Sequence, residues 1–337
     1  MPSPTNLLPG PASTELAIYC AWRLRGPLGA VVGGLCFILP GLAIILALSA
    51  VFLAAHPPRW VQGAAAGAGA AVPAVAVKAA IGLLPGSWRR AGTAISARAR
   101  WILYLVAGGV AEATIGPWIV LALAACGLIE TAVRAKPWPP STRTAHLFLS
   151  GAIAPTVAFG GLAALAWVAF KVGALSYGGG FVIIPLMQHD AVHTYHWMTS
   201  SQFLSAVALG QVTPGPVVLT VSVVGYAATG IGGGLLAALI AFTPSFAFII
   251  FGAPHFERLR ASTRIQAFFT GAGAAAIGAI AGSAIPLGLA LSHVWQLGIV
   301  GLTAIWLHAL RRSVVAALVT AGILGVIAAL AGLPTGP

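Results

Sequence analysis

Long apolar stretches constrain this chain more than any other feature. Residues 35–55, LCFILPGLAIILALSAVFLAA, contain no charged side chain, and similar runs recur along the 337 residues. A run of this length can cross the hydrocarbon core of a bilayer as a helix. The runs lack the alternation of apolar and polar residues that is typical of outer-membrane β-strands. With 59% hydrophobic and 7% charged residues, the composition predicts an all-α polytopic membrane protein.

The charge balance is strongly basic, at +12 from 17 Lys and Arg against 5 Asp and Glu. In a soluble protein this excess would indicate nucleic acid, but here the basic residues cluster in short loops between apolar stretches, as the positive-inside rule predicts. We therefore expect no nucleic-acid partner. Cys20, Cys36 and Cys126 lack metal or disulfide spacing and are interpreted as small buried hydrophobes. We expect neither a metal nor a cofactor, and the N-terminus lacks the basic region of a cleavable signal.

The chain divides into predicted spans joined by short loops and one longer polar connector. RAKPWPPSTRTAH, residues 134–146, is rich in proline and is interpreted as a linker between two halves, 1–133 and 147–337. The predicted spans are 28–54, 61–84, a short pair within 101–133, 147–169, a broken region from 173 to 228, 230–252, 265–290, 294–310 and 313–332.

The two halves resemble each other at an offset of 204 residues. This offset places Gly26 on Gly230, Pro40 on Pro244, and the GAGAA at 67–71 on the GAGAA at 271–275. Chance produces matched prolines less readily than matched alanines or glycines, so we interpret the chain as an internal duplication.

The loop charges indicate that the two copies have opposite orientations in the membrane. The loop 55–60 carries one Arg and its counterpart 255–264 carries three, whereas the Arg-rich segment 89–100 corresponds to HVWQLGIVG, which has none. Under the positive-inside rule this reversal predicts inverted repeats, which suit alternating access around a site near the midplane.

Two Pro-Gly-Pro triplets interrupt the apolar pattern, one at Pro9, Gly10 and Pro11 and the other at Pro214, Gly215 and Pro216. Proline lacks a backbone donor and disfavours helix at the preceding residue, but it suits the first turn of a new helix. We expect a half-helix N-terminus at 216–219, whose free N–H groups and dipole would bind an anion. Thr213, Gln211 and Thr220 would add neutral donors. The alternative is a plain kink or an interfacial loop.

A second break is predicted at GALSYGGGFVIIPLMQ, residues 173–188. Gly178, Gly179 and Gly180 would let the backbone approach a ligand closely, and the alternative is a close helix crossing. Neither GxGxxG nor a Walker A motif is present, so nucleotide binding is not supported.

Three charged residues fall in or beside apolar spans. Lys171 and Lys78 would either serve the anion site or snorkel to the interface. Glu15, one turn past the first triplet, would pair with a lysine or carry a coupling proton, although its place in a first helical turn explains it equally.

Histidines cluster in QHDAVHTYHW, residues 188–197. His189 and His193 have the spacing of a zinc site, but Asp190 stands where a zincin has Glu, so the segment is interpreted as a polar loop. An enzyme would need a nucleophile and a base that converge in one site, and the sequence shows no such pair beyond these histidines.

Several of these motifs together resemble the chromate ion transporter family. The motifs that carry the resemblance are LLPGPASTELAIYCAWRLRGPLG, FILPG, FKVGALSYGGGFVIIPLMQ, HWMTSSQFLSAVALGQVTPGPV, VGYAATG and TPSFAF. They occur in the same order as in the family, and the resemblance extends over nearly the whole chain. The resemblance implies a multi-pass protein of the bacterial inner membrane that exports chromate, with sulfate as a similar oxyanion, and that has two homologous domains of opposite orientation.

The first half departs from this family pattern. A Gly-rich segment and a helix precede each triplet in the family, whereas the first triplet here begins nine residues in, so the counterpart of about 147–204 is missing. We expect either a start further upstream or a shortened, inactive or regulatory form. The sequence does not distinguish chromate from sulfate or another oxyanion as the substrate. It also leaves open the energy source and whether the protein forms a homodimer.

Overall fold

The computed structural model describes residues 12–54, 57–115, 119–134, 161–176, 183–253 and 261–334. Every regular element within these ranges is helical. Four helical segments, 13–52, 59–91, 217–252 and 263–289, are long and apolar enough to cross a membrane, and shorter apolar helices accompany them. The prediction of an all-α multi-pass membrane protein is confirmed.

Most helices follow the predicted spans; the exceptions are the helical residues 12–24, which no predicted span covers, and the helix Gly161–Leu175, which ends six residues past the predicted span 147–169. The helices are α1 (Ala12–Phe52), α2 (Arg59–Ala91), α3 (Ile95–Ile115), α4 (Ile119–Arg134), α6 (Gly161–Leu175), α7 (Ile184–Gln188), the π-helix η4 (His189–Thr194), α8 (Ser200–Val212), the 3-10 turn η5 (Val217–Leu219), α9 (Thr220–Gly252), α11 (Thr263–Leu289), α12 (Val294–His308) and α13 (Val314–Leu330). The interpretation of 188–197 as a polar loop is wrong for its first part, because Gln188 ends α7 and 189–194 form η4.

Each of α1 and α9 is bent back on itself by one sharp turn. The turn in α1 lies at Arg25 (φ −141°, ψ 22°) and Gly26 (φ 61°, ψ −150°). The turn in α9 lies at Thr229 (φ −149°, ψ 26°) and Gly230 (φ 73°, ψ −155°). The glycines adopt a positive φ that other residues rarely reach, so the chain reverses at these two points. The two bends lie 204 residues apart, the same offset that aligns the two halves of the sequence.

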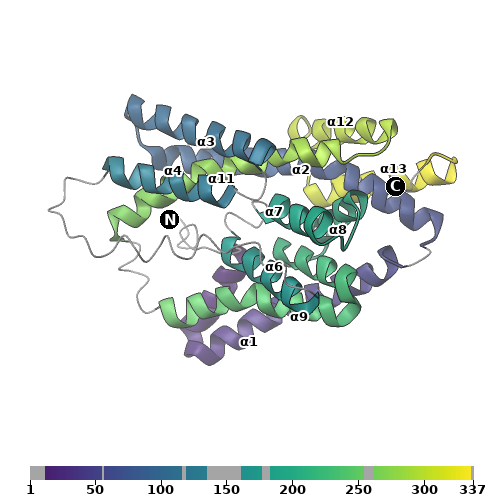
Figure 1. Cartoon of the computed structure of the whole chain (residues 1–337), viewed down its shortest axis with the longest axis horizontal. Coiled ribbons are helices and arrows are strands. Elements are labelled where there is room, and N and C mark those ends of the chain that lie inside the picture. Colours follow the sequence, from purple (N-terminus) through teal and green to yellow (C-terminus); the bar gives the residue numbers. More distant parts are fainter. Residues whose placement is uncertain are drawn as a thin grey trace.

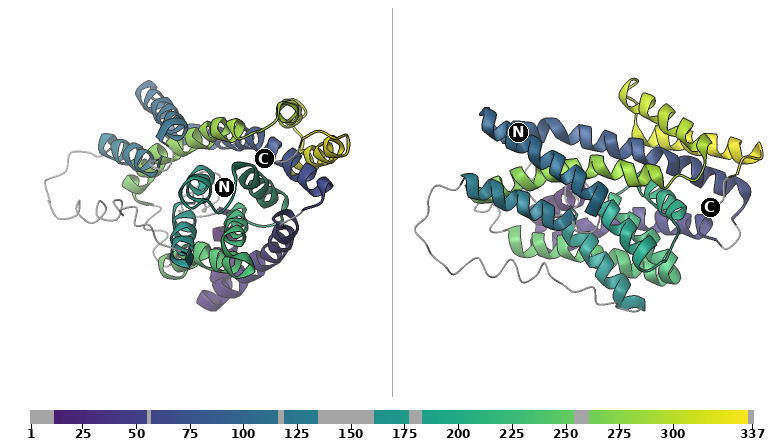
Figure 2. Two further views of the ribbon diagram at one scale, coloured as in Figure 1. Left: turned by 45° about the vertical axis from the view of Figure 1, so that its right-hand side comes forward. Right: turned by 45° about the horizontal axis from the view of Figure 1, so that its top comes forward.

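Short helix pairs pack at opposite ends of a central layer. Helices α3 and α4 pack on α11, and α12 and α13 pack on α2, while α1 packs on α9 and α2 on α11 (Figure 1). Each pair therefore packs on the long helix of the other half of the chain. Figure 2 shows from two further sides that the α3–α4 pair and the α12–α13 pair stay well apart.

Small residues let these helices approach closely, which is how helices associate in lipid. In α2, a side chain at Gly67 would collide with the carbonyl of Ala321 in α13. In α11, a side chain at Gly271 would collide with the carbonyl of Cys126 in α4. The repeated GAGAA segments thus hold corresponding helix crossings in the two halves.

Candidate functional site

The second Pro-Gly-Pro triplet separates two helices, α8 and the η5–α9 segment. Helix α8 ends at Val212, and Thr213 is extended (φ −69°, ψ 130°). Gly215 has a φ of 135°, and Pro216 is again extended before η5 begins at Val217. The fixed φ of proline and the freedom of glycine at a positive φ explain why the chain turns here.

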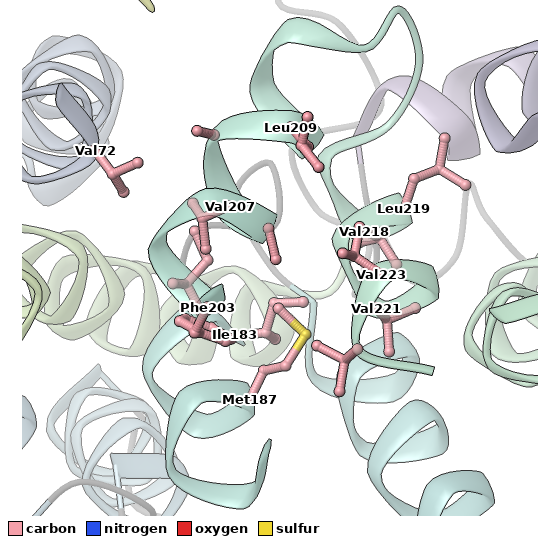
Figure 3. Packing of buried hydrophobic residues seen from close by; sticks show 14 of the residues in the cluster. Val72, Ile183, Met187, Phe203, Val207, Leu209, Val218, Leu219, Val221 and Val223 are labelled. Carbon is pink, nitrogen blue, oxygen red and sulfur yellow. The ribbon is translucent and has the colours of Figure 1, made fainter. Parts of the chain in front are cut away.

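The two helical segments lie side by side as a hairpin with the triplet at its tip. Figure 3 shows Phe203 and Val207 of α8 facing Val218 and Val221 of the returning segment. These residues belong to the main hydrophobic core. Within α8, a side chain at Gly210 would collide with Thr220, so a glycine is needed where the two segments approach each other.

The tip of this hairpin lies at the middle of α1. A side chain at Gly41 would collide with the carbonyl oxygen of Pro214, and the Gly41 Cα lies 3.8 Å from the position of a Cβ at Gly215. Gly41 is close to the midpoint of the segment that follows the bend and ends at Phe52. The triplet therefore reaches about half the depth of a membrane-spanning helix, and Pro214 and Gly215 stay exposed at its tip.

Unused hydrogen-bond donors gather at this tip. The first backbone bond of η5 is from the Leu219 amide to the Pro216 carbonyl (2.9 Å), so the amides of Val217 and Val218 precede the helical ladder. Thr213 Oγ1 and Gln211 Nε2 are buried and have no partner among the described residues. Thr220 was predicted to offer a neutral donor to the anion, but its hydroxyl donates to the Val217 carbonyl oxygen instead (2.7 Å).

The hairpin has no acidic side chain that could offset the partial positive charge of the free donors at its tip. The segment 200–219 contains no charged residue. Buried unpaired donors carry a substantial desolvation cost unless something accepts their hydrogen bonds. Helix N-termini attract negative charge, so the tip suits an anion that can accept several hydrogen bonds.

No contact among the described residues links Lys171 to the tip of the hairpin. Its ammonium forms an ion pair with Asp190 (2.5 Å) and lies 5.8 Å from the centre of the Trp167 ring. Asp190 is 9% exposed at its side chain, so this is a nearly buried pair between α6 and η4. Asp190 was not expected in this role, because its segment read as a solvated loop.

Lys78 has a structural partner at the end of another helix. Its ammonium donates to the carbonyl oxygen of Leu307 (3.0 Å), in the last turn of α12. A cation at a helix C-terminus compensates unpaired carbonyls and the helix dipole. With 33 residues α2 is about 50 Å long, and Lys78 lies less than one turn past its midpoint, so the C-terminal end of α12 meets α2 near its middle.

Glu15 has no lysine partner among the described residues. It lies in the first turn of α1 and is 0% exposed, like its neighbour Thr14. Both carboxylate oxygens of Glu15 and the hydroxyl of Thr14 lack a hydrogen-bond partner among the described residues. Its expected pairing with a lysine is not observed: Lys171 and Lys78 both have other partners.

The two histidines of the zinc-like spacing lie close together at η4. The rings of His189 and His193 have centroids 5.9 Å apart. Within the described part of the chain, no group of three His, Cys, Asp or Glu could hold a metal. Burial lowers the pKa of His189 despite the neighbouring Asp190 carboxylate.

Two groups of predicted site residues lie outside the described residues. They are the first triplet, Pro9, Gly10 and Pro11, and the glycine run, Gly178, Gly179 and Gly180. Their roles stay predictions.

A polar cavity of about 260 Å³ lies at the end of the bundle where α1 ends and α2, α8 and α12 begin. Its polar lining includes Gln62, Ser201, Gln202, Ser205, His293 and Gln296, and it contains no acidic residue. Ser205 lies on α8, about two turns before Thr213. The cavity thus extends along the helix that leads to the tip.

Sequence reasoning missed several of these features. Gly41 was visible only as part of FILPG, and its role depends on contact with a segment far along the chain. The cavity residues are Ser and Gln at helix starts, which resemble ordinary capping residues: Thr199 and Gln202 form a capping box on α8. Their convergence could not be read from spacing within one helix.

The fold and the tip together define a class, a multi-pass membrane protein with interrupted helices at mid-depth, as found in secondary transporters. The profile of the chromate transporter family matches residues 3–129 and 163–326. The chain belongs to the chromate transporter family, and it is a multi-pass protein of the bacterial cell membrane.

Named relatives are similar over most of their length. The chain is 34% identical over 291 residues to a chromate transport protein of Cupriavidus metallidurans, covering 84% of this chain and 70% of the relative. It is 30% identical over 332 residues to a probable chromate transport protein of Synechococcus elongatus, covering 96% and 83%. A chromate transport protein of Pseudomonas aeruginosa is 29% identical over 303 residues, with 84% and 69% covered. No solved structure matches the chain.

Proposed function

We propose that this protein transports chromate across the cell membrane, out of the cytoplasm, and that the tip at 213–218 binds the anion. Membership of the family and the names of its chromate-transporting relatives support chromate as the substrate. The observation that carries the site is the set of donors without a partner among the described residues, Thr213 Oγ1, Gln211 Nε2 and the first amides of η5, level with the middle of a membrane-spanning helix.

The chemistry of the tip suits a tetrahedral dianion. Several neutral donors from backbone and side chains share the negative charge, and the helix dipole adds a partial positive charge without a fixed cation. Both lysines are already paired elsewhere, Lys171 with Asp190 and Lys78 with the Leu307 carbonyl. Selectivity would rest on the geometry of the donors. Because sulfate has the same shape and charge, it is the first competitor to test.

The reaction we propose is transport and not catalysis. The matching bends of α1 and α9 and the reciprocal packing of the short helix pairs support an internal duplication of 1–133 and 147–337 with opposite orientations. Such repeats can rock around a site between them and open it to each side in turn. The polar cavity beside α8 would then form part of the path on one side.

The loop charges support one orientation of the protein in the membrane. The C-terminal end of α2, the start of α3 and the end of α4 meet through Arg100–Glu130 (2.9 Å) and Arg134 to the Ala91 carbonyl (3.2 Å). The basic residues of this end support a cytoplasmic position for it under the positive-inside rule, and the cavity at the opposite end of α2 would then face outside.

Uptake of labelled chromate into everted membrane vesicles tests the proposal. We expect uptake with the wild type and a loss of about tenfold or more with Thr213→Val or Gly215→Ala, which remove a donor or strain a residue at φ 135°. Gly232→Ala is the matched control, since a side chain there meets nothing within 4 Å. Undiminished uptake in both tip variants would remove the tip from the site.

Unlabelled sulfate added to the same vesicles decides how far the substrate class extends. Competition at similar concentrations would show an oxyanion transporter of broad selectivity. Vesicles with no uptake of either anion, although the protein is inserted, would contradict the transport function itself.

A further inference from the structure

Two of the described acidic residues are paired near helix ends, and two are buried without a pair. Glu130 is bound by Arg100, Arg134 and Tyr104, and Asp190 is bound by Lys171. Glu112 and Glu15 have unpartnered carboxylate oxygens within the apolar helices α3 and α1. An isolated ionised carboxylate in such surroundings is very costly, so a group of this kind is neutralised by a proton.

Glu15 lies close in depth to the hairpin tip. The two segments of α1 run antiparallel, and a Cβ at Gly34 would lie 2.9 Å from Ile18 Cγ1, so these two residues are level with each other. Counting back three residues places Glu15 level with residue 37. Gly41, which contacts Pro214, is four residues further on, or about 6 Å along the helix axis.

Within the described ranges, no charged group of the elements packed on α1 pairs with Glu15. Helix α1 packs on α9, α8, η5 and α2. Its own titratable or charged groups are Cys20, Arg25, Cys36, and Arg23, whose guanidinium bonds Tyr19 (3.5 Å). Segment 200–219 has none, and α9 contributes Tyr226. Helix α2 contributes Lys78, which is bound to the Leu307 carbonyl, and arginines at its two ends.

We propose that Glu15 is the proton-binding residue of the anion site, so that the dianion binds when Glu15 is protonated and each bound dianion is accompanied by one proton. This inference rests on the proposed function. An ionised Glu15 would repel a dianion bound within about one helical turn of the same depth in a medium of low dielectric, whereas the protonated form would not. By linkage, the bound anion must then favour protonation of Glu15 to the same extent.

Proton uptake on chromate binding measures this linkage directly. Purified full-length protein in weakly buffered detergent solution is mixed with chromate, over the alkaline range in which chromate stays a dianion, and an indicator dye reports the protons taken up. We expect up to one proton per bound anion with the wild type. Once the carboxyl ionises, affinity should fall by about tenfold per pH unit.

Variants separate the proton site from a structural role. Glu15→Gln mimics the protonated form and should bind chromate with no proton uptake and no pH dependence, while Glu15→Asp should restore both. Glu112→Gln, which removes the other unpaired acid, is the matched control and should behave as the wild type.

The outcomes distinguish this inference from the proposed function. A wild type that binds chromate without proton uptake would overturn the role of Glu15 and leave transport intact. That role is overturned equally if folded Glu15→Gln keeps the proton uptake or loses chromate binding. A wild type that neither binds nor transports chromate would instead contradict the proposed function.

Discussion

The bend of α1 at Arg25–Gly26 and the bend of α9 at Thr229–Gly230 have nearly the same dihedral angles, yet the segments before them differ in polarity. The first turn of α1 carries Thr14 and Glu15, both buried and unpartnered among the described residues. The corresponding turn of the second half has Leu219 in the core and Thr220, whose hydroxyl bonds the chain locally. Backbone geometry can therefore be duplicated while the two copies acquire different chemistry.

The largest effect is expected where the second half has something the described first half does not, the Lys171–Asp190 pair. Lys171→Ala leaves a buried carboxylate without its partner, which should lower the free energy of unfolding by about 3 kcal/mol. Thermal unfolding in detergent measures this. The double variant Lys171→Met with Asp190→Leu should recover most of the loss. If it recovers stability but not transport, Lys171 has a further role in the site.

The two bends should respond alike to the same substitution. Gly26→Ala and Gly230→Ala force a side chain into backbone conformations at φ 61° and 73° that are nearly exclusive to glycine, at a cost of about 2 kcal/mol each. Gly232→Ala lies beside the second bend without a positive φ and is the control. Denaturation curves that shift for one bend only would break the equivalence of the two halves.

The contact of α1 with the tip should be more sensitive than its counterpart. Gly41→Ala pushes against the Pro214 carbonyl and should lower chromate transport by about tenfold, or about 1.4 kcal/mol. Ser245 occupies the aligned position in α9, where a side chain is already accommodated, so Ser245→Ala should change transport little. Equal losses in both variants, measured in everted vesicles, would show that the tip contact is not specific to Gly41.

The smallest effect is expected at Lys78. Lys78→Met keeps the length of the side chain but removes the donor to the Leu307 carbonyl, which should cost about 1 kcal/mol of stability. Thermal unfolding in detergent measures this cost, and transport per inserted molecule should stay unchanged. A large loss of transport at normal stability would place Lys78 in the anion path.

Sequence reasoning located the helices well because apolar length and proline position act locally. It also placed the break at 213–216, since two prolines around a glycine cannot continue a helix. The prediction of a polar loop at 188–197 was wrong for its first part because the partner of Asp190, Lys171, lies on another helix and cannot be inferred from the local sequence. The sequence could not show that Lys78 binds a backbone carbonyl, because that carbonyl belongs to Leu307, 229 residues away. It also could not show that Glu15 has no hydrogen-bond partner among the described residues.

The sequence by itself determined that the chain is a helical membrane protein, where its helices are interrupted, and which family it belongs to. Hydrophobic length, prolines and ordered motifs are properties of neighbouring residues, so they can be read along the chain. Only the tertiary structure decided that the interrupted helix folds into a hairpin whose tip meets the middle of α1. It also decided that Lys78 and Lys171 have partners while Glu15, among the described residues, has none. These facts depend on contacts between segments far apart in the chain, which close helix packing creates.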